Sequence, residues 1–66
     1  MEHIRDTKRP LAEQMKNLEV GDILVCPPEE VFKAAAYASK YGFMWSRKFR
    51  THKDSERRAF MVTREE

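Results

Sequence analysis

The chain has little of what usually holds a small protein together. Among its 66 residues there is one cysteine, Cys26, so no disulfide can form within a single chain. The two histidines, His3 and His52, lie far from Cys26 and from each other, without the paired spacing of a metal site. A chain this short buries only about 60% of its unfolded surface. We therefore expect a partner subunit to contribute stability, and we predict a homodimer.

Long apolar runs and glycine-rich loops are also missing. No apolar stretch has the length of a membrane span or a signal peptide, and the lone thiol indicates a reducing, cytoplasmic setting. Two glycines are too few for a phosphate-cradling loop. Cys26 precedes the start of a predicted helix, where a thiolate is stabilised, but no general base accompanies it, and a small buried residue is the preferred interpretation. We therefore predict a protein that is not an enzyme and that uses no metal and no cofactor.

Charge is distributed unevenly along the chain. Residues 1–30 carry four basic and seven acidic residues, a net −3, and residues 31–66 carry nine basic and four acidic residues, a net +5. The segment from Phe43 to Arg64 holds seven Lys or Arg against two acids, interleaved with aromatic residues. A basic surface of this kind is first of all a candidate for binding phosphate.

One strand and one helix are predicted in the middle of the chain. The apolar run Ile23–Cys26 is typical of a strand that is buried on both faces or paired with its copy in a second subunit. Pro27-Pro28 and two glutamates open a helix, and Gly42 stands where a left-handed cap belongs. The predicted core stripe of this helix is Val31, Phe32, Ala35, Ala38 and Ser39, and the predicted solvent stripe is Lys33, Tyr37 and Lys40.

The last third alternates between apolar and polar residues, as a β-hairpin does. Phe43–His52 and Arg57–Arg64 are the predicted strands, with a turn at residues 53–56. Pairing Phe49 with Phe60 puts the large aromatic residues on one face, towards the helix, and the basic residues on the other. Trp45, Phe49 and Phe60 have the chemistry to stack on unpaired bases, but so small a domain needs them in its core.

These elements predict an α+β fold in the order β-α-β-β, with one helix packed on a small antiparallel sheet. Residues 18–64 form this single domain, and residues 1–17 form a short N-terminal arm with a frayed start and one helical turn after Pro10. The arm is expected to cover a sheet edge or join a dimer. The dimer contact is expected either at Ile23–Cys26 or on the outer face of the helix.

Two groups of residues are candidates for binding. Guanidinium groups suit phosphate through paired hydrogen bonds, and a two-stranded ribbon fits the major groove of B-DNA. The alternative is a solvated face that stays charged to prevent edge aggregation. The candidates for nucleic-acid binding are Lys48, Arg50, His52, Lys53, Arg57 and Arg58. The candidates for contact with a protein partner are Tyr37, Tyr41, Met44 and Met61.

The order of short motifs resembles a group of small bacteriophage-encoded accessory proteins. A Val20-Gly21-Asp22 turn, an apolar strand, prolines and an alanine-rich helix are followed by Lys48-Phe49-Arg50-Thr51 and by a final strand ending in a basic residue. The position after Thr51 departs from the pattern, with His52 where Arg is expected. The resemblance implies a phage-type protein that binds DNA or modifies host machinery, and it implies no catalytic residue.

Two functions follow from these observations. The first is non-enzymatic nucleic-acid binding, with double-stranded DNA as the preferred ligand, in a regulatory or architectural role. The second is a protein–protein inhibitor of phage type, which docks on a host protein in the host cell cytoplasm and blocks it. A structural dimer or filament subunit remains a third class, because the apolar first strand is able to add to another sheet.

Overall fold

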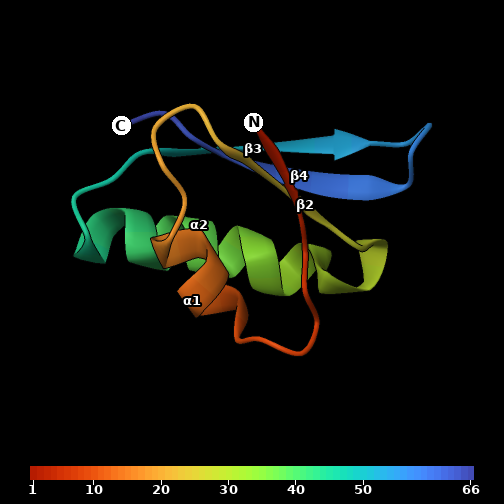
Figure 1. The fold of residues 1–66 in the computed structure, drawn as a ribbon, viewed down its shortest axis with the longest axis horizontal. Helices are drawn as coiled ribbons and strands as arrows, with labels where there is room; N and C mark the ends of the chain where they lie inside the picture. The colour runs from red at the N-terminus through yellow and green to blue at the C-terminus, as the bar shows by residue number, and fades with distance from the viewer.

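A computed structural model describes all 66 residues, which form a sheet layer and a helix layer (Figure 1). The strands are β1 (Glu2–Ile4), β2 (Ile23–Cys26), β3 (Phe49–Asp54) and β4 (Ala59–Arg64), and the helices are α1 (Leu11–Lys16) and α2 (Val31–Met44), the latter preceded by a 3₁₀ turn at Pro28–Glu30. Both helices lie on one side of the sheet (Figure 1). The predicted α+β class and the order strand, helix, strand, strand after residue 18 are confirmed.

The sheet has the order β1-β2-β4-β3, with β1 parallel to β2 and the other neighbours antiparallel. The three strands predicted from the sequence pair antiparallel as expected, and the parallel β1, which was not predicted, makes the sheet mixed. Strand β2 has a neighbour on each side, which leaves it no free edge to pair with its copy in a second subunit. Its Leu24 and Cys26 are buried and its Ile23 and Val25 are only half-buried, so β2 is covered on one face and not on both.

The hairpin has the predicted faces in a different register. Phe49 pairs with Arg64 and not with Phe60, and the turn lies at residues 55–58. The shift is four residues, and an even shift keeps every side chain on its face. Phe60 and Val62 are therefore buried against the helices as predicted, and Phe49 packs partly against them. Strand β3 begins at Phe49 and not at Phe43, because α2 continues to Met44.

The end of α2 differs from the expected glycine cap. Gly42 lies inside the helix, where an added Cβ would lie 3.2 Å from the carbonyl oxygen of Arg47. The Arg47 N–H donates to the Gly42 carbonyl oxygen at 2.9 Å, so the chain folds back closely over this position. The left-handed residue is Ser46, with a φ of 52°. Phe43 does not fold back onto the helix and is 90% exposed.

The core-facing side of α2 also differs from the prediction. Ala34 and Ala38 are buried against the sheet, and Val31, Tyr37 and Trp45 pack partly against the core. The alanines bring the helix backbone close to the sheet, while the larger aromatic side chains fill the space beside it. Of the predicted core stripe, Phe32, Ala35 and Ser39 are exposed instead.

The N-terminal segment is part of the core and is not only an arm. Leu11 and Met15 of α1 are fully buried, which confirms the helical turn after Pro10. Residues 2–4, predicted to be frayed, form the edge strand β1, and the Arg5 N–H extends this pairing by donating to the Val25 carbonyl oxygen at 2.9 Å. The buried apolar cluster is Leu11, Met15, Leu18, Leu24, Cys26, Ala34, Ala38, Phe60 and Val62.

A buried ion pair fixes the start of the chain to the start of α2. The side chain of Arg5 is only 4% exposed, and its Nε lies 3.1 Å from the Glu30 Oε1 atom. Its Nη2 donates to the other Glu30 oxygen at 3.2 Å, and its Nη1 donates to the Arg9 carbonyl oxygen at 2.7 Å and to the Gln14 side-chain oxygen. One guanidinium thus connects the β1–α1 loop, α1 and the turn before α2.

We predict that Arg5→Met destabilises the fold by about 3–5 kcal/mol, because it leaves the Glu30 carboxylate buried without its partner. The double variant Arg5→Met/Glu30→Met restores much of the stability, since both charges are then absent. Urea denaturation measures both effects. Arg9→Ala is the control, because the Arg9–Asp6 pair is exposed and contributes about 0–1 kcal/mol. Equal stability of Arg5→Met and the wild type would contradict the central role of this pair.

Candidate nucleic-acid interface

Strand β3 forms one edge of the sheet and carries a line of cations on the face away from the helices. Arg50 and His52 are directed to this outer face, opposite Thr63 and Met61 of β4. Lys48 continues the line, because the Glu65 N–H donates to its carbonyl oxygen at 2.7 Å and so extends the pairing. The three side chains are exposed and none of them forms an ion pair, although Glu65 stands opposite Lys48. We call Lys48, Arg50 and His52 the β3 line.

The outer face of the sheet changes character from one edge to the other. Beside the β3 line lies an apolar middle, and Glu2 and Ile4 of β1 occupy the opposite edge. Ile4 is 75% exposed, so apolar surface reaches that edge as well. The apolar middle consists of Ile23, Val25, Ala59 and Met61. The basic charge is thus concentrated along one border of this face.

Arg57 is not a free cation. Its Nη1 and Nη2 atoms donate to the two carboxylate oxygens of Glu2 at 3.3 and 3.2 Å. This bidentate pair lowers the pKa of Glu2, and the same hydrogen bond raises the pKa of Arg57. The sequence predicted Arg57 on the outer face of a strand. In the structure it lies in the hairpin turn instead. A phosphate that binds Arg57 has to compete with Glu2.

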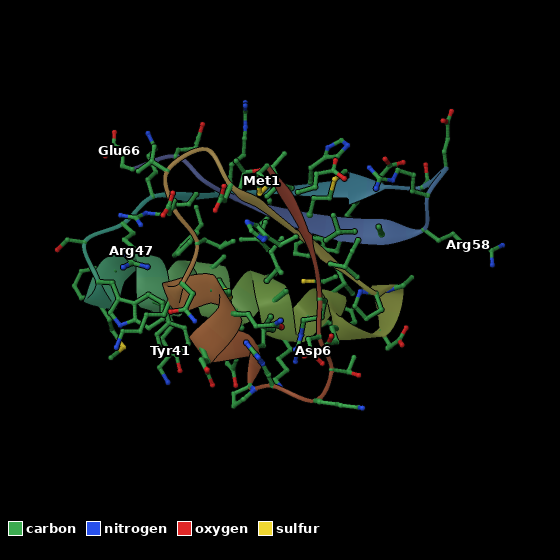
Figure 2. All side chains as sticks on the ribbon, in the orientation of Figure 1. Met1, Asp6, Tyr41, Arg47, Arg58 and Glu66 are labelled. Carbon is green, nitrogen blue, oxygen red and sulfur yellow. The ribbon has the colours of Figure 1, made fainter.

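The hairpin turn has its own geometry. The Asp54 Oδ1 atom accepts hydrogen bonds from the Glu56 and Arg57 N–H groups at 3.1 and 3.2 Å, which is typical of an Asx turn. Arg58 completes the turn with a φ of 50°. Figure 2 shows the Arg58 side chain at the end of the hairpin, directed away from the rest of the molecule.

Lys53 and Arg58 lie at an open pocket of about 480 Å³. The pocket lies between the hairpin end and the start of α2, with Pro28, Val31 and Phe60 among its lining residues. Lys53 lies on the helix-facing side of the sheet, because it pairs with the buried Phe60. The six predicted nucleic-acid residues therefore form three groups: the β3 line, the pair at the pocket, and Arg57 in its ion pair.

The four residues predicted to contact a protein partner do not share one surface. Tyr41 lies in the helix layer (Figure 2), where its ring stacks on Trp45 with 4.4 Å between centroids, and it meets Tyr37 edge-on at 5.1 Å. Both tyrosines are half-buried and do not belong to a solvent stripe. Met44 is exposed at the end of α2, and Met61 lies on the outer face of the sheet.

Two features of these surfaces were missed from the sequence. Glu2, the partner of Arg57, lies 55 positions away, and no local pattern links the two. The exposed Phe32 and Phe43 of α2 did leave a signal, because they stand at helical spacing with Ala36 and Ser39. The prediction had placed Phe32 in the core stripe of the helix and Phe43 on the core-facing side of the hairpin.

Cys26 is the last residue of β2, and its side chain lies in the core between the sheet and the helices, with 1% of the residue exposed. Burial raises the pKa of its thiol to about 11, and the nearby Glu30 carboxylate adds to the shift, while Arg5 opposes it. The thiol is therefore protonated at neutral pH and shielded from reagents.

Comparison with protein-family models, curated proteins and solved structures finds no match to this chain. No group of three or more His, Cys, Asp or Glu side chains is arranged to hold a metal ion. No helix has both the length and the apolar character that crossing a membrane requires.

We predict that stability falls as the pH rises from about 9 to about 11, because the unfolded thiol releases its proton near pH 9.0 while the folded thiol keeps it up to about pH 11. Urea midpoints measured across this range show the fall. Cys26→Ala is the control, since it lacks the thiol and keeps every other side chain. A parallel decrease of stability in both proteins would contradict the assignment.

Proposed function

We propose that the protein is a non-enzymatic nucleic-acid-binding protein that lays the β3 edge along the backbone of double-stranded DNA. The observation that carries this proposal is the β3 line, three exposed cationic or ionisable side chains in a row, none of which forms an ion pair. Consistent with the sequence resemblance, the proposal includes the protein among phage-type accessory proteins that act in the host cell cytoplasm.

The spacing of the β3 line suits a phosphate backbone. Alternate residues of a strand lie roughly 6.6 Å apart, comparable with the separation of successive phosphates along a nucleic-acid strand. The Arg50 guanidinium is able to bind phosphate through two hydrogen bonds, and the Lys48 ammonium contributes charge. Such contacts position a protein on DNA without reading its sequence.

The hairpin end adds two further cations on the other face of the sheet. Lys53 and Arg58 lie at the pocket on the helix-facing side of the hairpin end, and neither forms an ion pair. The tip is narrow, because only the two strands and the turn form it. A ribbon of this width enters a major groove, whereas the whole four-stranded sheet is too broad.

A second candidate function is docking on a host protein as an inhibitor. The observation that favours it is the apolar middle of the outer face, which ends at the exposed Ile4. Aliphatic surface of this kind contributes little to phosphate binding and is common at protein interfaces. The two functions differ in salt dependence, because neutralising phosphates releases counterions and docking aliphatic surface does not.

We predict that Lys48→Ala/Arg50→Ala weakens binding to unrelated DNA duplexes alike. The slope of log affinity against log salt should flatten by about two units, one for each phosphate that the variant no longer neutralises. Fluorescence anisotropy at several salt concentrations measures both quantities, and melting temperatures confirm that the fold is intact. The matched control is Lys8→Ala/Lys16→Ala, which removes the same charge from exposed positions outside β3.

Two outcomes would reject the DNA proposal. One is a wild-type protein that binds no DNA at low salt. The other is an equal decrease of affinity in the β3 variant and in its control, which would mean that only net charge matters. Retained binding to a host protein at high salt would then favour the inhibitor.

We predict that Glu2→Gln strengthens DNA binding, because it frees Arg57 from its bidentate carboxylate partner. The salt slope should steepen by about one unit as Arg57 becomes able to bind a phosphate. Glu13→Gln is the control, since it removes the same charge from an exposed position on α1. If affinity rises equally in both variants, Arg57 is not part of the interface.

A further inference from the structure

The side of α2 that faces away from the sheet carries two almost fully exposed phenylalanines. Phe32 is 86% exposed and Phe43 is 90% exposed, and Met44 beside them is 59% exposed. The exposed residues between them on this side are Ala35, Ala36 and Ser39, all of them small. No element of the chain covers either ring, as their exposed fractions show.

The spacing of these residues defines a straight seam. Phe32, Ala36, Ser39 and Phe43 follow one another at intervals of four, three and four residues, as the inner positions of a heptad repeat do. At 100° per residue, the seam lies almost opposite the direction of the buried Ala34 and Ala38. It is therefore separate from the core-facing side of the helix.

The seam is complementary to itself in an antiparallel arrangement. A two-fold axis that passes between Tyr37 and Ala38 in sequence position puts Phe32 of one copy beside Phe43 of the other, and Ala36 beside Ser39. The small central residues allow the helices to approach closely, and the large rings at both ends pack against each other. A contact of this type closes on itself, as a two-fold dimer requires.

The lysines next to the seam are drawn away from it. The Lys33 ammonium lies 5.8 Å from the centre of the Tyr37 ring, and that of Lys40 lies 5.4 Å from the centre of the Tyr41 ring. Both rings belong to the flank of α2 and not to its outer side. The attraction of each ammonium for its ring reduces the repulsion that these charges exert across a dimer.

The area available matches what a dimer needs. Covering four phenylalanine side chains, two from each copy, removes roughly 600–1,000 Å² from water at the area typical of a buried aromatic side chain. The small residues, Met44 and the lysine stems supply the remainder up to the roughly 1,200 Å² at which specific interfaces begin.

We propose that the protein is a homodimer in which the α2 helices of two copies pack antiparallel along the Phe32–Phe43 seam, the second copy being the occupant of this surface. The inference stands apart from DNA binding, because the seam lies in the helix layer and the β3 line lies in the sheet layer. The driving force is burial of apolar surface, so the dimer persists as salt is raised.

Sedimentation equilibrium in the absence of nucleic acid tests the proposal. We expect the wild type to have twice the chain mass of 7.9 kDa at tens of micromolar, and Phe32→Gln/Phe43→Gln to be a folded monomer. Glutamine is a good helix former, so the variant keeps α2. Ile4→Gln is the matched control, because it removes an exposed apolar side chain from β1 and should leave the dimer intact.

A cross-linking experiment tests the register. When Ala36→Cys and Ser39→Cys proteins are mixed under mild oxidation, disulfides should form between the two variants in preference to pairs of like variants. The buried Cys26 does not compete. A monomeric wild type at hundreds of micromolar overturns the proposal, even if the seam then binds another protein or a lipid surface. A dimer that survives Phe32→Gln/Phe43→Gln, or that forms at Ile4, overturns it as well.

Discussion

The guanidinium of Arg5 lies almost without solvent between the loop after β1, the helix α1 and the turn before α2. A buried charge is tolerated only when it is paired and hydrogen-bonded, so these three segments hold their positions together. Pairing with Glu30 keeps the first residues beside β2, so that β1, and not β2, is the edge strand opposite β3. The ion pair thus determines which side chains border the outer face of the sheet on the side away from the basic edge.

The short strand β1 is retained by side chains as well as by its backbone pairing with β2. It has three residues, yet His3 lies 3.0 Å from Asp22, Glu2 holds Arg57, and the residue that follows the strand is Arg5. The hydrogen bond from the Glu19 N–H and then the one with His3 lower the pKa of Asp22, which favours its ionised carboxylate. Through Glu2, the same strand also controls how much of the charge on the hairpin turn is available to a ligand.

The faces of the hairpin followed from the sequence, because alternation has a period of two and survives an even shift of register. The register of the hairpin could not be predicted from the sequence in the same way. The end of α2 at Met44 and the Asx turn at Asp54 together determine which residues of β3 and β4 pair. The prediction of which side of α2 faces the core was wrong, because alanine fits both buried and exposed positions and so does not distinguish the two sides of this helix. Arg5 and Glu30 lie 25 positions apart, and no local pattern connects them.

The two proposed surfaces lie on opposite layers, and this has a physical consequence for binding. If α2 pairs with its copy, the two sheets face outwards and each presents one β3 line, related by the two-fold axis. A single β3 line makes few phosphate contacts, and such binding is weak at physiological salt. In a dimer, once one β3 line has bound, the second binds the same nucleic acid in an intramolecular step. The overall affinity then exceeds that of one line alone, provided that the nucleic acid reaches both lines. In this arrangement, the exposed phenylalanines of the helix layer determine how strongly the cations of the sheet layer act.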